Sequence, residues 1–525
     1  MPMHPARSGG YMLAALLLAL TQGLGMNLVT ANITQIQGSI GATTNEATWM
    51  VAAYMAPNVS LSLALIKIRA QYGLRNFAEI SILGFVLASA LNLMINDLPS
   101  AIIVRFMSGI AAAPMSTLGF LYMLEPFRPE RKMQVGLPLA LTNISLGAPV
   151  ARLISPTLLD IEGWHNVTLL EVALALIAFC LVYNLPLGQP HPRAKVIEKL
   201  DVVSYLLIAI GFGATAVVLV LGRLYWWFEA PWLGVSLAVA IACVATAAVI
   251  ELNRENPLLD IRWLSSPAVL HFTGALLVFR VVLSEQTTGA AGLFQVFGLN
   301  NGQTITLYWI ILVASVAGGL SCVAVMKPGR EPEIHLVALA FLIAGALMDS
   351  RSTNLTRPEE MYLSQALIAF AGALFLPPAL LSGLMSALKK GPNYILSFVI
   401  VFLTTQSLGG LLGSAVFGTF ITWREKLHSH ALVEHLALTD PIVAQRVAQL
   451  SGAYARSLTD KALLNQEGIA LLGQQATREA NVLAYNDAFL LIAALAALAF
   501  VCLLIHIAFD TIRRWQVAAP QTASS

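Results

Sequence analysis

Two arginines lie inside apolar stretches of the chain that are long enough to cross a lipid bilayer. Arg105 lies in the run 100–124 and Arg152 in the run 134–157. An ionisable side chain at the centre of a membrane helix costs about 3 kcal/mol on insertion scales, so such residues usually face a polar cavity. A guanidinium there is a bidentate partner for a carboxylate or a phosphate. The pair therefore predicts a cavity that favours anions.

Each arginine also has a structural alternative. Arg152 can form a permanent ion pair with Glu171 of the following apolar run, which would neutralise both charges. Arg105 can donate to buried backbone carbonyls or bridge to Asp97. Glu171 lies about one turn inside its run, so contact with water is also open for it. These alternatives differ in which partner each guanidinium contacts.

A second group of polar residues lies in the apolar run 267–296. Arg280 and Glu285 are five residues apart, which places them about 140° apart around a helix and disfavours an ion pair between them. Each therefore needs a partner on another helix. A carboxylate buried in apolar surroundings is a candidate proton carrier, and Glu285 is the best candidate here. Gln286 is expected to add a polar contact to the cavity.

The composition assigns these residues to an integral membrane protein. Of the 525 residues, 57% are hydrophobic and only 11% are charged, against about 25% in soluble domains; the mean hydropathy is +0.75. The four cysteines have no paired spacing, so we expect neither disulfides nor metal ligands. No nucleophile motif, metal cluster or phosphate loop suggests an enzyme or a cofactor, and no charged tail suggests a nucleic-acid partner.

The fold class predicted is an all-α membrane protein with fourteen spans, because a span needs roughly 20 apolar residues. The runs lie near 11–33, 47–66, 77–96, 100–124, 134–157, 166–187, 201–222, 231–251, 267–296, 303–326, 335–349, 360–386, 393–422 and 484–508. Polar connectors divide them into six, two and six. The predicted domains are an N-terminal six-helix bundle (1–190), two inserted central helices (191–262) and a C-terminal six-helix bundle (263–525).

The basic residues predict the orientation. With a cytoplasmic N-terminus, most lysines and arginines fall in cytoplasmic loops, as the positive-inside rule requires. The short outer loops then keep only Arg223, Arg351 and Arg357. This orientation also places the C-terminus in the cytoplasm.

One long outer segment, residues 424–482, is polar with apolar residues at helical spacing. We expect amphipathic helices that lie over the outer face. Its histidines, His428, His430 and His435, stand near Glu434. A solvated helix face explains them better than a zinc site.

Several stretches together resemble the fourteen-span drug:proton antiporters of the major facilitator superfamily, the EmrB-like exporters. They include ITQIQGSIGATTNEATWMVAAYMAPN, VRFMSGIAAAP, SLGAPVARLISP, REKLHSHALVEH and ANVLAYNDAF. The resemblance covers essentially the whole chain. It implies the major facilitator fold and proton-driven export of lipophilic or aromatic compounds, without a cofactor. It implies that Arg105 matches the span 4 arginine that assists proton transfer.

Three departures from the family pattern fall on its working motifs. Span 1 has Gly25 where the family usually has an acid, with Asn27 and Asn32 as the nearest polar groups. The loop IKIRAQYGLRNF lacks the acid of the family's loop motif. In span 5, Arg152 stands where a glycine is usual, so Arg152 is the residue expected to distinguish this chain from the family.

The expected function is secondary active transport by alternating access, with the site near the midplane between two bundles. The predicted cavity holds more cationic than anionic groups, so we expect an amphipathic or aromatic small molecule with negative charge. The proton gradient supplies the energy, and the location is the bacterial inner membrane. Family members often act with a periplasmic adaptor and an outer-membrane channel, which are the expected partners. Uptake or facilitated passage of a metabolite or siderophore by the same fold is the alternative.

Overall fold

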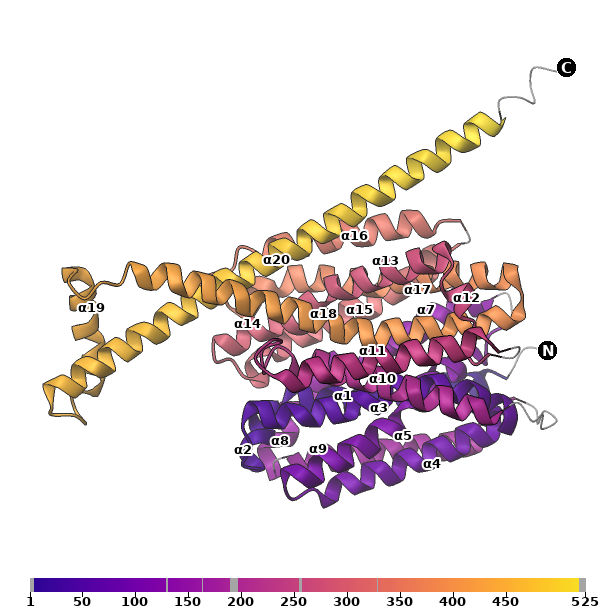
Figure 1. Cartoon of the computed structure of the whole chain (residues 1–525), viewed down its shortest axis with the longest axis horizontal. Helices are drawn as coiled ribbons and strands as arrows, with labels where there is room; N and C mark the ends of the chain where they lie inside the picture. Colours follow the sequence, from indigo (N-terminus) through magenta and orange to yellow (C-terminus); the bar gives the residue numbers. More distant parts are fainter. Residues whose placement is uncertain are drawn as a thin grey trace.

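Long helices that run side by side form the molecule (Figure 1). The computed structural model describes residues 4–128, 131–162, 164–188, 197–254, 257–327 and 329–518, and no strand occurs within these ranges. In them, twelve helices are long and apolar enough to cross a membrane. The predicted count of fourteen is therefore not confirmed. Two predicted spans, α3 (Thr44–Tyr72) and α18 (Pro392–Glu434), are not among the twelve and stay predictions.

The N-terminal part has one hydrophobic core whose buried residues, apart from Ala216 of the segment 199–221, come almost entirely from its own helices. They are α1 (Pro5–Ala31), α2 (Ile33–Ser39), α3, α4 (Leu74–Leu91), α5 (Leu98–Leu124), α7 (Leu137–Ser145), α8 (Gly147–Glu162) and α9 (Trp164–Asn184). The helix predicted over 134–157 is not continuous. A π-helical segment (Lys132–Gly136) precedes α7, and the helix is interrupted between the end of α7 and the start of α8. Asp97 caps the start of α5 through Ser100, and these hydrogen bonds lower the pKa of its carboxyl group.

A second hydrophobic core lies mainly in the C-terminal part, and Leu137 and Leu141 of α7 also belong to it. The elements of the C-terminal part are α13 (Pro267–Ser284), η3 (Glu285–Ala290), α14 (Ala291–Val296), η4 (Asn301–Thr304), α15 (Ile305–Val325), α16 (Glu331–Asp349), α17 (Tyr362–Lys390), α18, α19 (Pro441–Ser451) and α20 (Lys461–Ala518). The segment 424–482 is helical as predicted, but it does not lie over the end of the bundle. Instead α18 and α20 continue past the bundle and α19 packs at their far end (Figure 1). Val443 and Val447 are buried there.

Glycines allow the closest helix crossings. A side chain at Gly109 of α5 would collide with the backbone carbonyl of Tyr54 in α3. A Cβ at Gly413 of α18 would lie 2.7 Å from the backbone oxygen of Arg280 in α13. Small residues at such positions let helix backbones approach closely. Gly409, Gly410 and Gly413 form a glycine stripe of this kind on α18, against Arg280 of α13.

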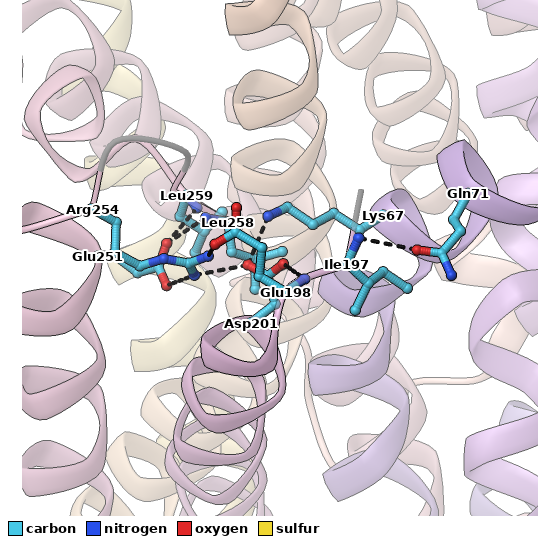
Figure 2. Close-up of polar contacts among 9 residues, drawn as sticks. All are labelled: Lys67, Gln71, Ile197, Glu198, Asp201, Glu251, Arg254, Leu258 and Leu259. Atoms are coloured by element: carbon cyan, nitrogen blue, oxygen red, sulfur yellow. Dashed lines mark hydrogen bonds and ion pairs between the residues drawn. The ribbon is translucent and has the colours of Figure 1, made fainter. Parts of the chain in front are cut away.

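The two inserted helices, α10 (Lys199–Leu221) and α11 (Pro231–Leu252), are fastened to the N-terminal bundle by a polar latch (Figure 2). Lys67 of α3 contacts Asp201 at 2.6 Å, and Arg254 contacts the same carboxylate at 2.7 Å. Arg254 also bonds Glu198 and Glu251. Burial disfavours the charge of Arg254, but these carboxylates outweigh it and raise its pKa above the usual value.

Candidate functional site

In the N-terminal bundle, Arg105 is buried beside Gly25 of α1, the position at which the family pattern has an acid. Its Nη2 donates to the carbonyl oxygen of Gly25 at 2.8 Å, and its guanidinium lies 4.4 Å from the ring centroid of Tyr54. The Glu171 carboxylate of α9 interacts electrostatically with it. A Cβ at Gly25 would lie 3.0 Å from Glu171 Oε1. Glu171 therefore occupies the space that a side chain at residue 25 would take.

This arrangement decides between the alternatives for Arg105 and Glu171. Arg105 donates to a buried backbone carbonyl, and no bridge to Asp97 forms. Glu171 is only 6% exposed, so it does not simply meet water at the helix end. Its neighbours are Arg105 and Ser89, whose hydroxyl donates to it at 3.4 Å.

Arg152 lies at the boundary between the two bundles. Its Nη1 donates to Asn301 Oδ1 at 3.2 Å, and its guanidinium lies 5.3 Å from the ring centroid of Tyr308 in α15. It forms no ion pair with Glu171, so the predicted alternative of a permanent pair is wrong. Arg152 faces η4 and α15 of the C-terminal bundle, whereas Glu171 faces α4 and α5 of the N-terminal bundle.

Asn301 connects Arg152 to further residues of the N-terminal bundle. Its Nδ2 donates to the carbonyl oxygen of Ala31 at 3.0 Å and to Asn32 Oδ1 at 2.9 Å. Asn32 in turn donates to Ser155 of α8 at 2.7 Å. Three hydrogen bonds of one side chain thus join the N-terminal bundle to the C-terminal bundle, and Arg152 makes one of them.

In the C-terminal bundle, two carboxyl groups meet in the protein interior. Glu285 is fully buried and Asp349, the last residue of α16, is 2% exposed. The Gln365 amide of α17 donates to both, at 3.0 Å to Glu285 and at 2.7 Å to Asp349. Gln286 donates to the Gln365 carbonyl at 3.2 Å. Glu285 opens a π-helical segment, a rare geometry that is frequent at functional sites.

Further polar atoms of this cluster have no hydrogen-bond partner within the described residues. They are Glu285 Oε2 and the side-chain oxygen of Gln365. A buried acceptor without a donor costs free energy, and a proton on one carboxyl group supplies the missing donor.

Arg280 and Asn27 do not join these clusters. Arg280 lies against the glycine stripe of α18, where a Cβ at Gly410 would stand 2.5 Å from its Nη2. No ion pair between Arg280 and Glu285 is found, as their spacing predicts. Asn27 donates to the carbonyl oxygen of Gly23 in its own helix at 2.7 Å, whereas Asn32 makes the contacts between helices.

Sequence reasoning missed three of the residues that these clusters need. Asp349 closes the apolar run 335–349, and an acid at that place was a usable signal for a second carboxyl group. Gln365 and Asn301 carry no such signal, because uncharged amides are common near helix ends.

Two of the three histidines of the segment 424–482, His428 and His430, lie close to carboxylates. His428 Nε2 lies 2.6 Å from Asp487, which Arg424 also contacts at 2.6 Å, and His430 lies 3.4 Å from Glu434. Over the described ranges, no group of three or more His, Cys, Asp or Glu side chains has the arrangement of a metal site.

Comparisons with known proteins address the family. The model described as "Major Facilitator Superfamily" matches residues 15–423. The multidrug export protein EmrB of Haemophilus influenzae is 25% identical, with 96% of each chain covered. The probable multidrug resistance protein EmrY of Escherichia coli is 23% identical over 99% of this chain and 98% of its own. The solved human organic anion transporter MFSD10 shares the fold, with a TM-score of 0.56 and 12% identity over 94% of this chain and 100% of its own. The chain therefore belongs to the Major Facilitator Superfamily, as a multi-pass membrane transporter similar to bacterial multidrug export proteins.

Proposed function

We propose that this transporter is a proton-driven exporter of amphipathic or aromatic anions in the bacterial inner membrane, with both termini in the cytoplasm. The observation that carries the proton coupling is the buried pair of Glu285 and Asp349 bridged by Gln365. Two ionised carboxylates in one apolar interior are strongly disfavoured, so the pair holds a proton that can be exchanged during transport. The similarity to multidrug export proteins supports export, and a periplasmic adaptor with an outer-membrane channel would complete the route.

In this mechanism the two bundles have different tasks. The Glu171 carboxylate already has the Arg105 guanidinium beside it, so its charge is balanced without a proton. The Glu285 and Asp349 pair has no described ion pair with a cation, so a proton is what balances it. Rocking of the bundles would expose the pair to each side of the membrane in turn.

The proton test uses everted membrane vesicles with an imposed pH gradient. Glu285→Gln and Asp349→Asn should each lose gradient-driven accumulation by at least about 10-fold, whereas substrate exchange without a gradient should persist, because only the proton site is removed. The matched control is Glu359→Gln, an exposed acid of the same bundle. Full proton coupling in both buried-acid variants would overturn the assignment.

The charge of the substrate rests on Arg152. Its guanidinium contacts an amide and an aromatic ring and makes no ion pair within the described residues, so it is available to an anion. We expect Arg152→Ala to weaken transport of an anionic lipophile by about 10-fold or more, the scale of one charge-assisted hydrogen bond. The exposed Arg351→Ala serves as control. Accumulation of cations alone, unchanged in Arg152→Ala, would contradict the proposal; movement in the opposite direction would indicate uptake.

A further inference from the structure

A groove of about 390 Å³ lies outside the central clusters, between the inserted helices and the C-terminal bundle. Leu219 of α10 and Trp227 form one wall, and the face of α18 from Leu412 to Trp423 forms the other. Val416 and Trp423 are 45% and 55% exposed. The volume is within the range of small-molecule sites, roughly 300–1,000 Å³. The lining is almost wholly apolar.

The aromatic wall of the groove is held by a strained turn. Trp226 has φ +52, a left-handed conformation that is unusual for a bulky residue and often marks functional sites. The Trp227 ring then folds over Gly222, where a Cβ would collide with it. Trp227 Nε1 donates to Thr419 Oγ1 at 2.9 Å. This bond satisfies the one hydroxyl on the α18 wall and leaves the groove apolar.

One cation stands at one end of the groove. Lys426 follows Thr419 by seven residues on the same helix face, and its Nζ lies 4.3 Å from the Trp226 ring centroid. Lys426 makes no ion pair with another described residue. The neighbouring Glu425 accepts a hydrogen bond from Ser429 at 2.6 Å.

The two walls belong to parts of the molecule that alternating access moves against each other. The latch of Lys67, Asp201 and Arg254 ties α10 to α3 in the N-terminal bundle (Figure 2). In contrast, α18 packs on α13 and α20 of the C-terminal bundle. The width of the groove therefore depends on the rocking of the bundles.

We propose that this groove is a lateral binding site for a long-chain carboxylate, with the chain between Leu219 and Val416 and the carboxylate at Lys426. The occupant follows from the apolar lining and from a cation without a carboxylate partner at one end. This assignment rests on the proposed transport of amphipathic anions, because it gives that class a second site that opens toward the bilayer.

The test measures tryptophan fluorescence of the full chain in phosphatidylcholine vesicles, with 9,10-dibromostearate as a quenching probe. Saturable quenching should be present in the unaltered chain, weaker in Trp423→Phe, where Trp227 on the other wall is still quenched, and undiminished in Trp309→Phe, since Trp309 is similarly exposed but lies on α15. Lys426→Gln should raise the half-saturation concentration by roughly 5-fold, the scale of one exposed ion pair. The methyl ester of the probe should bind to the unaltered chain as weakly as the acid binds to the Lys426→Gln variant.

A second pair of variants fills space. Val416→Phe should abolish the saturable quenching, whereas Val313→Phe, at an exposed position of α15, should not. Equal quenching by a dibrominated phospholipid, or equal binding of acid and ester, would mean that the groove holds only the chains of bilayer lipid and would overturn the proposal. Saturable binding of the acid without any anion transport would instead overturn the proposed function and leave the groove site in place.

Discussion

The guanidinium of Arg105 lies between a carbonyl of α1 and a carboxylate of α9, and neither partner is close to it in the sequence. Gly25 leaves the space that the Glu171 carboxylate fills. An acid from the sixth predicted span thus stands where the family resemblance places an acid of the first. At the residue scale, the charge balance of the site is kept although the motif is lost.

This balance predicts a reciprocal exchange. Glu171→Ala leaves Arg105 as a buried charge without a carboxylate, which should reduce the free energy of unfolding by about 3 kcal/mol. Adding Gly25→Asp to Glu171→Ala should recover much of this loss, because it returns an acid to the same space. Thermal unfolding of purified protein in detergent measures both. A double variant less stable than Glu171→Ala alone would contradict the exchange, and Glu359→Ala controls for loss of an exposed acid.

At the scale of elements, π-helical turns and glycines set the places where helices bend and cross. The segment η3 places Glu285 at the end of α13, within reach of α16 and α17. The glycine stripe of α18 brings α13 so close that the backbone of Arg280 forms part of the contact. The position of the carboxyl pair therefore depends on the crossing of α13 and α18.

The crossing can be tested with two glycine substitutions. Gly413→Ala should lower the free energy of unfolding by about 1–3 kcal/mol, since its Cβ would meet a backbone oxygen that cannot rotate away. Gly274→Ala on α13 meets no atom within 4 Å and should be neutral or stabilising by up to about 1 kcal/mol through helix propensity. Chemical unfolding in mixed detergent compares them. Equal effects of the two substitutions would show that the crossing is not tight.

At the scale of the whole molecule, the side chain of Asn301 joins the two bundles and shares Arg152 with the proposed anion site. An anion that draws Arg152 away would remove one of the three hydrogen bonds across the boundary. Binding of the substrate and separation of the two bundles at this end are then linked through the guanidinium of Arg152. Such a link is a coupling between site and conformation, and it is reciprocal.

Asn301→Ala should shift the population toward the state in which this end is open, by roughly 5- to 30-fold for the loss of 1–2 kcal/mol. The shift is measured as the distance between spin labels at Thr34 of α2 and Gln295 of α14, both exposed. Asn354→Ala, which removes an amide within the C-terminal part alone, is the control. An unchanged distance distribution in Asn301→Ala would show that the hydrogen bonds of Asn301 do not hold this end of the boundary closed.

Composition and the lengths of the apolar runs were sufficient to predict an all-helical membrane protein and the limits of most helices, whereas the family was predicted from the resemblance of particular sequence stretches. The apolar runs also located Arg105, Arg152 and Glu285, because a charge inside a long apolar run stands out by its cost. The extent of α18 and α20 beyond the bundle was not predictable, since a polar helix with apolar spacing can lie on a surface or continue a span equally well.

The partners of the charged residues were decided by the tertiary structure alone. From the sequence, Glu171 could contact either Arg152 or water, and in the structure it lies beside Arg105. Glu285 lies beside Asp349, and the amide of Gln365 donates to both. These contacts join helices that are about 65 to 80 residues apart in the chain. Local patterns carry the orientation of a residue on its own helix, whereas the crossing of helices, set by glycines such as Gly109 and Gly413, decides which faces meet.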